Sequence, residues 1–341
     1  MGVTIKDVAK ECEVSIATVS RVLNDTAYVE DELKQKVYEA VKKLNYYPNS
    51  IAKNLKKGST LTIAFVVSDF SNDYYTSVAT SIENVIHEHN YNMVIYASNG
   101  DGKSELNILK ELMSNRIDGL IINTTGKNDD LIIELSKKLP IILINRKLKL
   151  TGFDGDFFGS NNIEAMHTLV AHLLSLGHRN IGIINGSMDV NTGLERYQGF
   201  KNAMLDAGID LPEDYCYKFD GDFSEESGYH GASALMSKLE PPTAIVVSNN
   251  DMTLGALKYM RLHRINIPEE VTISCFGSIK NIELLFVRPN IMVMDPRVIG
   301  KEIGERIIKR LINNNLENCS VIFESKLVEG DFTKLESHAK K

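Results

Sequence analysis

The chain has 341 residues, a formal net charge of −7 and 43% hydrophobic residues, enough for two or three domains with sizeable cores. Its four cysteines are scattered without C-x-x-C spacing, which argues against a disulfide framework or a cysteine metal site. No membrane-length apolar run and no secretory signal segment appears, so we expect a cytoplasmic protein without a membrane partner.

The first helical segments show an amphipathic pattern. Thr4 can cap a first helix, and Ser15 can cap a second one, on which Val19, Val22 and Leu23 form an apolar stripe. The side chains left facing outward on this second helix are Ile16, Ala17, Thr18, Ser20 and Arg21. The pattern is typical of a helix-turn-helix, whose second helix contacts base edges in the major groove. Any small helical bundle needs such a stripe, so periodicity alone leaves that alternative open.

The order of residues in this segment carries more information than its periodicity. The motif T-I-x-D-V-A begins at Thr4, V-S-x-x-T-V-S-R-V-L-N begins at Val14, and N-Y-Y-P-N begins at Asn45. These motifs resemble the head of the LacI/GalR family of bacterial transcription regulators, and a looser similarity extends to about Gly330. The head departs from the family at Glu13, where a turn glycine is usual, and at Glu30, where a capping serine is common.

The resemblance implies a set of DNA contacts, a third helix over residues 37–44 and a hinge segment after it. Leu55 from each subunit would wedge into a central base step of a pseudo-palindromic double-stranded operator, which requires a homodimer. In the head the implied contact residues are Thr4, Ser15, Ile16, Ala17, Thr18, Ser20, Arg21, Asn24, Tyr28 and Tyr46. In the hinge they are Asn49, Ala52, Lys53 and Leu55.

The charge is divided unevenly along the chain. Residues 1–60 hold ten basic and eight acidic side chains, whereas the remainder holds 28 and 37. The acidic balance therefore lies outside the predicted DNA-binding segment, where it aids solubility. The lysines of the head and hinge are candidate phosphate contacts, with a solvated charged face as the alternative.

Beyond residue 60, apolar runs alternate with helix-length segments, which predicts parallel sheets covered by helices on both faces. The expected strands are 61–68, 92–97, 119–123, 141–144, 180–185, 243–247, 271–276 and 291–294. We therefore expect an α/β protein with a helix-turn-helix headpiece and a hinge helix. By resemblance, two doubly wound subdomains of periplasmic-binding-protein type follow.

The resemblance also implies domain boundaries. They are a DNA-binding domain over 1–46, a hinge over 47–60, an effector-binding and dimerisation core over 61–333, and a tail over 334–341. The N-subdomain would take about 61–160 and 291–324, and the C-subdomain about 161–290 and 325–333. The chain would then cross between them near Ser160, Asn290 and Ser325.

Catalytic motifs are missing from the sequence. It contains no phosphate-binding loop, dinucleotide fingerprint, serine-hydrolase elbow or H-E-x-x-H motif, so no catalytic residue, cofactor or metal is expected. Asp154-Gly-Asp156 and Asp220-Gly-Asp222 lack the further ligands of a calcium loop and are interpreted as turns. An α/β enzyme remains the alternative from another class. A transport-type sugar-binding protein is contradicted by the head.

The family's ligand-binding motifs match polar and aromatic positions in the core. By resemblance, the candidate effector-binding residues are Asp69, Ser71, Asn72, Asp73, Tyr74, Tyr75, Asn145, Arg146, Asn161, Arg196, Asn250, Asp251, Phe276 and Gly277. They offer carboxylates and amides for hydroxyl groups, guanidinium groups for anions, and aromatic faces for a sugar ring. An ion pair of Arg196 with Glu195 is the structural alternative for that arginine.

Several of these positions depart from the family pattern. Asn145, Asn161 and Gly277 stand where the family commonly has aspartate, and Asp73 replaces a usual proline. Fewer carboxylates would then face the two arginines, which favours an anionic effector such as a sugar acid or a sugar phosphate over a neutral sugar.

The sequence therefore indicates an allosteric, carbohydrate-responsive regulator, in most such proteins a repressor. A catabolite-type regulator controlled by a protein coregulator is the alternative.

Replacing Arg21 by Ala tests direct base readout by the second helix. A bidentate contact between arginine and guanine predicts a loss of about 1–3 kcal/mol at the specific site and a much smaller loss on random DNA. Fluorescence anisotropy with both duplexes measures the difference. Equal losses on the two duplexes would make Arg21 a phosphate contact only.

Overall fold

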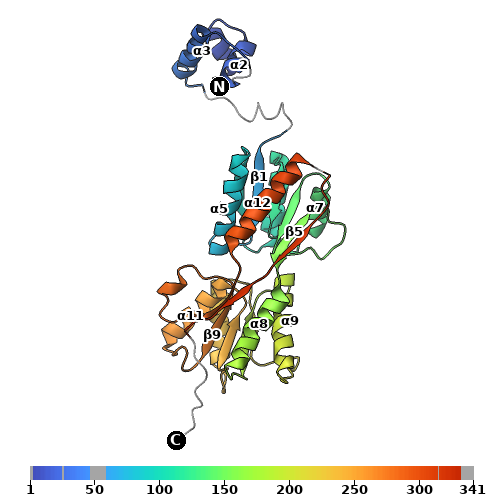
Figure 1. Ribbon diagram of the computed structural model, residues 1–341, viewed down its shortest axis with the longest axis vertical. Coiled ribbons are helices and arrows are strands. Elements are labelled where there is room, and N and C mark those ends of the chain that lie inside the picture. Colours follow the sequence, from blue (N-terminus) through green and yellow to red (C-terminus); the bar gives the residue numbers. More distant parts are fainter. Residues whose placement is uncertain (1–2, 25–26, 47–58, 314, 332–341) are drawn as a thin grey trace. The chain divides into compact units, whose positions relative to one another are not determined.

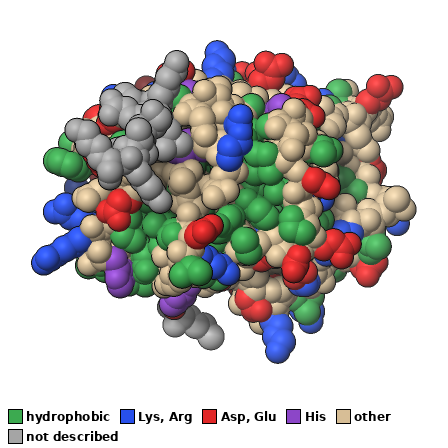
Figure 2. All heavy atoms as spheres, turned by 90° about the horizontal axis from the view of Figure 1, so that it is seen from below, with side chains coloured by type: hydrophobic (Ala, Val, Ile, Leu, Met, Phe, Trp, Pro, Cys, Tyr) green, Lys and Arg blue, Asp and Glu red, His purple; other side chains and the backbone are tan. Residues whose placement is uncertain are grey.

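The computed structural model describes residues 3–24, 27–46, 59–313 and 315–331, and the chain divides into two units, Met1–Thr60 and Leu61–Lys341. None of the described helices is long and apolar enough to span a bilayer. The molecular face drawn in Figure 2 mixes acidic, basic and apolar side chains, in keeping with the mixed charged composition of the chain.

The first unit is a three-helix headpiece. It comprises α1 (Ile5–Glu11), α2 (Ile16–Asn24) and α3 (Asp31–Lys43), packed around a core that includes Val8, Val19, Val22 and Val37. The two predicted helix starts are confirmed. The Asp7 carboxylate accepts hydrogen bonds from the backbone N and hydroxyl of Thr4 (2.8 and 2.7 Å), and Thr18 N donates to Ser15 Oγ (3.1 Å).

Two details of the headpiece follow from the departures noted in the sequence. Glu13 adopts φ 55°, the left-handed conformation that usually favours glycine, and this turn separates α1 from α2. The third helix starts at Asp31, six residues before the predicted start at 37. Asp31 and Glu32 in its first turn complement the positive end of the helix dipole, although Glu30 makes no side-chain cap.

The second unit contains two parallel sheets, which confirms the predicted fold class. The first sheet has the order β11-β5-β4-β3-β1-β2, and all its pairings are parallel. Its strands are β1 (Thr62–Val67), β2 (Asn92–Ala97), β3 (Gly119–Ile122), β4 (Ile141–Ile144), β5 (Asp156–Ser160) and β11 (Ser320–Phe323). Its helices are α5 (Asp73–Glu88), α6 (Gly102–Asn115), α7 (Asp129–Ser136) and α12 (Pro296–Ile312). We call this part the N-lobe.

The second sheet has the order β12-β10-β9-β8-β6-β7, with β12 antiparallel to β10. Its strands are β6 (Ile181–Asn185), β7 (Lys218–Asp220), β8 (Ala244–Val247), β9 (Thr272–Phe276), β10 (Asn290–Val293) and β12 (Lys326–Val328). Its helices are α8 (Asn162–Ser175), α9 (Asn191–Asp206), α10 (Glu225–Met236), α11 (Asn250–His263) and the short η1 (Ile282–Leu284). We call this part the C-lobe.

The chain passes between the lobes three times. It leaves β5 for α8 at Asn161, leaves β10 for α12, and runs from β11 into β12 along the red segment of Figure 1. The second crossing lies after Val293 and not near Asn290, because residues 290–293 pair with β9 and β12 in the C-lobe sheet. The sequence placed residues 291–293 in the other subdomain.

The eight predicted strands are present, each within one residue of its predicted limits, whereas β5, β7, β11 and β12 were not predicted. Asp156 was interpreted as part of a turn, but it begins β5 and is fully buried. Its two oxygens accept hydrogen bonds from Arg306 and Arg310 on α12 at 2.7–2.9 Å, and from Cys319 N at 2.7 Å. This ion cluster fastens α12 to the edge of the N-lobe sheet.

Asp156→Asn is expected to destabilise the protein by about 3–5 kcal/mol, because it leaves two partly or fully buried guanidinium groups without their anion. Burial alone would raise the pKa of Asp156, but the hydrogen bonds from Arg310 and Arg306 hold it well below its usual range. The stabilisation is therefore present above the unfolded pKa of about 4 and is lost as the pH falls below it.

Urea unfolding at pH 7 and pH 3 measures both effects, with the exposed Asp154→Asn as a matched control. Equal stability of the two variants at pH 7 would contradict this role of the cluster.

Candidate functional site

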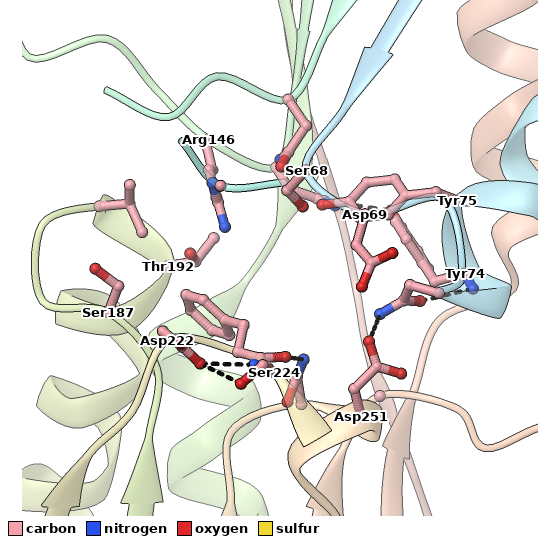
Figure 3. A pocket seen from close by; sticks show the side chains of 18 of the residues that line it. Ser68, Asp69, Tyr74, Tyr75, Arg146, Ser187, Thr192, Asp222, Ser224 and Asp251 are labelled. Carbon is pink, nitrogen blue, oxygen red and sulfur yellow. Dashed lines mark hydrogen bonds between the residues drawn. The ribbon is translucent and has the colours of Figure 1, made fainter. Parts of the chain in front are cut away.

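A cavity of about 380 Å³ lies between the two lobes. Its lining comes from segments that follow the carboxyl ends of strands: Asp69 after β1, Asn123 after β3, Arg146 after β4, Asn250 after β8, and Gly277 after β9. Parallel strands end at the same edge of a sheet, and ligand sites of open α/β sheets lie outside that edge. The fold thus brings the polar strand ends of both lobes to one place (Figure 3).

Most of the predicted effector-binding residues line this cavity. They are Asp69, Asn72, Tyr74, Tyr75, Asn145, Arg146, Arg196, Asn250, Asp251, Phe276 and Gly277. Gly277 has φ 116°, a conformation that side-chain-bearing residues rarely adopt, although an added Cβ would meet nothing closer than Asn250 N at 3.7 Å.

Three predicted residues do not line the cavity. Ser71 donates its backbone N and hydroxyl to Asp69 Oδ1 (2.8 and 2.7 Å), so it shapes the turn instead. Asp73 pairs with Lys280 of the C-lobe at 3.3 Å. Asn161 lies at the first crossing, where its Oδ1 accepts from Ser325 N at 3.0 Å.

The two arginines of the cavity are held by neutral groups. Arg196 donates Nε to Asn162 Oδ1 (2.9 Å) and Nη1 to Ser248 O (2.5 Å), and its guanidinium lies 3.9 Å from the ring centre of Phe276. Arg146, which is buried, donates Nη1 to Thr124 O (3.1 Å). Neither forms an ion pair with any described carboxylate.

The alternative pairing of Arg196 with Glu195 does not occur. Glu195 accepts instead from Asn162 Nδ2 (2.8 Å) and pairs with Lys147 (3.2 Å). Burial lowers the pKa of Arg196 to about 10, which leaves it charged at neutral pH. Two guanidinium groups with free charge therefore face one cavity.

Phe223 is a cavity residue that sequence reasoning missed. Its ring centre lies 5.5 Å from the Arg146 guanidinium carbon and 6.0 Å from that of Arg196. The backbone adopts φ 75°, and Asn249 Nδ2 fixes its carbonyl oxygen at 2.8 Å. A Cβ on Gly186 would meet the ring at 2.0 Å, so any side chain at that position would displace Phe223. The segment after β7 was interpreted as a turn; recognising β7 would have placed Phe223 at the cleft.

The opposite side of the cavity is acidic. Asn72 caps α5 by accepting from Tyr74 N (2.9 Å), and its Nδ2 crosses to the C-lobe, where it donates to Asp251 Oδ2 (2.6 Å) and Asn250 Oδ1 (3.1 Å). One side chain thereby joins the first turns of α5 and α11. Burial raises the pKa of Asp251 to about 6; the Asn72 hydrogen bond opposes this rise, and the charge of Asp69 adds to it.

Further contacts across the cleft lie on its other margin. Lys127 of the N-lobe pairs with Asp189 of the C-lobe at 2.8 Å, and Asn191 Nδ2 donates to Asn145 O at 3.3 Å. Both members of the first pair line the cavity and were not predicted. Their side chains neutralise each other, so they add no net charge to the site.

Asn123 and Tyr74 complete the polar lining described here. Asn123 is fully buried and donates Nδ2 to Ile144 O (2.9 Å), while its Oδ1 has no hydrogen-bond donor in the described structure. Tyr74 donates its hydroxyl to Asn145 Oδ1 (3.2 Å), and burial raises the pKa of Tyr74. No group of three or more potential metal ligands gathers within the described ranges.

In the headpiece, the predicted DNA-contact residues are largely accessible. Thr4, Ser15, Ala17 and Arg21 are exposed, and the exposed fractions are 44% for Ile16 and 88% for Tyr28. Thr18, Ser20 and Asn24 are half-buried, and Tyr46 packs against the headpiece core. The predicted hinge residues Asn49, Ala52, Lys53 and Leu55 lie outside the described residues.

Comparison with known families separates regulators from enzymes of similar fold. Residues 4–49 match the model of bacterial regulatory proteins of the lacI family, and residues 60–322 match that of periplasmic binding proteins and the sugar-binding domain of the LacI family. The chain belongs to the LacI family. This LacI-family chain is thus a DNA-binding transcriptional regulator with an effector-binding core, and the expectation that it is not an enzyme is confirmed.

Relatives match this LacI-family regulator over nearly the whole chain. The ribose operon repressor of Haemophilus influenzae is 29% identical over 95% of this chain and 97% of the relative. The repressor PurR of Aliivibrio salmonicida is 30% identical over 92% and 94%, and catabolite control protein A of Priestia megaterium is 28% identical over 94% and 96%.

A solved structure of a lac repressor dimer bound to operator and the anti-inducer ONPF matches with a TM-score of 0.79. Its identity is 21%, over 97% of this chain and 98% of that one, so the match supports the fold alone.

Asn72→Ala is expected to loosen the cleft. The loss of an N-cap costs about 1 kcal/mol, and the variant also removes the hydrogen bonds that join Asn72 to the C-lobe. Hydrogen–deuterium exchange should therefore quicken in the first turn of α11, although the mutation lies in the other lobe.

Asp101→Ala is the matched control, because Asp101 caps α6 by accepting from Ser104 N (2.8 Å) within its own lobe. Faster exchange in α11 for both variants would mean that general destabilisation is the cause.

Proposed function

We propose that this LacI-family protein is a homodimeric repressor of a carbohydrate-use operon, released from or directed to a pseudo-palindromic operator by a small molecule in the cleft between its lobes. The names of its relatives support this assignment, since they include a ribose operon repressor and HTH-type transcriptional repressors that match over nearly their whole length. The observation that carries it is the joint presence of the headpiece and of a polar cavity between two lobes.

We propose DNA contacts through the exposed face of α2. Ile16, Ala17 and Arg21 project from its outer side, while Val19 and Val22 are buried beneath. Hydrogen bonds from Arg21 and apolar contacts from Ala17 are the interactions that read base edges in the major groove. The hinge residues, with Leu55 as the wedge, complete this proposal.

For dimerisation we propose the face of the N-lobe formed by α5 and β2. This face carries an apolar hollow lined by Phe65, Val67, Phe70, Tyr75, Thr76, Ala79, Thr80, Glu83, Met93 and Ile95. Phe70 is 46% exposed, and an unfilled apolar hollow of this kind favours a protein partner over water. A second copy would pair its own α5 across the two-fold axis.

The effector that we propose is anionic, a sugar acid or a sugar phosphate. Two arginines in the cavity lack a described anionic partner, and guanidinium groups bind carboxylate and phosphate bidentately. The total charge of the lining does not by itself favour an anion, because Asp69, Asp189, Asp222 and Asp251 also line the cavity. Arg146 and Arg196 favour an anion because neither is paired with a described carboxylate.

Regulation would proceed by a shift of population between open and closed lobes. A ligand held by Arg146 of the N-lobe and Arg196 of the C-lobe binds only the closed arrangement well, so it favours that arrangement by its differential affinity. The spacing of the paired N-lobes in the dimer would then differ between the two states and alter operator affinity.

A ligand screen by thermal shift tests the effector class, using sugars, sugar acids and sugar phosphates. Operator affinity is then measured by fluorescence anisotropy with each compound that raises the melting temperature. Arg196→Ala should leave operator affinity within about twofold of the parent and abolish the response to an anionic effector, because one arm of the anion site is lost.

Arg179→Ala is the control, since Arg179 bonds only the nearby carbonyl oxygens of Leu174 and His178. Tight binding of a neutral hexose with no response to its acid or phosphate would exclude the anionic class. If no operator is bound specifically, the repressor assignment itself fails.

A further inference from the structure

Charged side chains lie on both sides of the cavity. In Figure 3, Arg146 and the exposed Asp222 lie on one side, and Asp69 and Asp251 lie on the other. The ring centre of Phe223 lies 5.5 Å from the Arg146 guanidinium carbon and 6.0 Å from that of Arg196, so the two arginines flank one aromatic ring. A ligand held by the two arginines would therefore extend toward the two carboxylates.

The two carboxylates have donors but no counter-ion. Asp69 accepts from the backbone and hydroxyl of Ser71, and Asp251 accepts from Asn72. Neither pairs with any described lysine, arginine or histidine, although Asp73 and Asp189 of the same region are paired with lysines. Both side chains are also partly shielded from water. Their negative charge is thus left uncompensated inside the cleft.

A neutral sugar hydroxyl would not remove the repulsion between the carboxylates of Asp69 and Asp251. It could donate one hydrogen bond, but the two negative charges would remain together in a site that excludes more water once the lobes close. An ammonium group would donate up to three hydrogen bonds and offset one of the two negative charges. Burial raises the pKa of Asp251, and the nearby charge of Asp69 adds to that rise.

The acceptor of Asn123 supplies an independent observation. Its amide is fully buried at the end of β3 and lines the cavity, and its Oδ1 has no donor among the described residues. A buried acceptor without a donor costs free energy, which a ligand N–H or O–H would recover. The cavity therefore favours a ligand that carries hydrogen-bond donors as well as an anionic group.

We propose that the effector is zwitterionic: an anionic group held by Arg146 and Arg196, and a protonated amine held by Asp69 and Asp251. An amino sugar phosphate has this chemistry, and a cavity of about 380 Å³ lies in the size range of small-molecule sites. The inference rests on the proposed function, because it takes the arginine pair as the anion site.

Three sugar phosphates separate the amine from the rest of the ligand. Glucosamine 6-phosphate carries the amine, glucose 6-phosphate replaces it by a hydroxyl, and N-acetylglucosamine 6-phosphate replaces it by a neutral amide. Isothermal titration calorimetry with the full-length protein at pH 7 should give glucosamine 6-phosphate an affinity at least about tenfold higher than either of the others.

Equal or weaker binding of the amine overturns the inference, and if glucose 6-phosphate still binds, the proposed anion site is retained. Binding of unphosphorylated glucosamine as tight as its phosphate supports the amine site and contradicts the anionic one. No binding by any of the three overturns the zwitterionic class.

Single substitutions of the two carboxylates test whether they hold the amine of the ligand. Asp251→Asn and Asp69→Asn should each reduce the preference for glucosamine 6-phosphate over the N-acetyl compound to less than about threefold, since each removes half of the negative charge. Asp251→Asn keeps an oxygen that can accept from Asn72, and a circular dichroism melt of each variant checks that it folds.

The matched control is Asp222→Asn. Asp222 lines the same cavity, but it is exposed and accepts from Ser224, so the preference should stay at the parent's value. A preference that survives Asp251→Asn and Asp69→Asn, or that is lost in Asp222→Asn alone, contradicts the assignment.

The same preference should fall as the pH is lowered through about 6, where Asp251 takes up a proton and loses its charge. The other charged groups near Asp251 are Asp69, Asp73 with its partner Lys280, and Glu225 with its partner Lys258. Because the phosphate is common to both compounds, its own titration cancels in the ratio of affinities. A ratio that rises on acidification contradicts the role of Asp251.

Discussion

The geometry of the cleft depends on one constraint, which is that the parallel strands of both lobes end toward the same boundary. Several strand ends lead through a short loop into a helix whose first turn carries polar side chains, as at α5, α9 and α11. Three crossings hold the two boundaries close enough for Asn72 to bond Asp251 from the other lobe. The loops therefore supply the side chains of the site, while the sheets determine where the site lies.

Two kinds of polar contact in the core have different roles. The Asp156 cluster is buried within one lobe and satisfied by two arginines, so it makes the N-lobe rigid. The contacts across the cleft are single hydrogen bonds or exposed ion pairs, which contribute little each and can be exchanged for ligand contacts. Strong contacts within a lobe and weak contacts between the lobes suit a regulator that changes between two arrangements of its lobes.

The sequence predicted the fold well where periodicity and apolar content agreed. Eight strands followed from runs of Ile, Val and Leu, and their limits were accurate because Gly, Pro and Asn flank these runs. β5 was missed because Asp156 and Gly159 interrupt its apolar pattern, and the reason for a buried aspartate lies 150 residues away, in Arg306.

The site residues were likewise predicted where a local sequence motif identifies them. Most residues of the family motifs lie in the cavity, but Ser71 donates to the nearby Asp69 carboxylate. Asn161 accepts from Ser325 N and Asp73 pairs with Lys280, and no local pattern reveals partners so distant in the sequence. Phe223 was missed because its importance comes from two arginines of different lobes.

The backbone conformation of Gly277 limits how the site can change by substitution. The backbone at Gly277 lies at φ 116°, where any side chain is strained whatever the space around it. A substitution of Gly277 by aspartate would therefore have to move the loop after β9 as well as add a carboxylate. Neither Asp69 nor Asp251 has a positive φ, so a change of side chain there alters the charge of the site without that backbone cost.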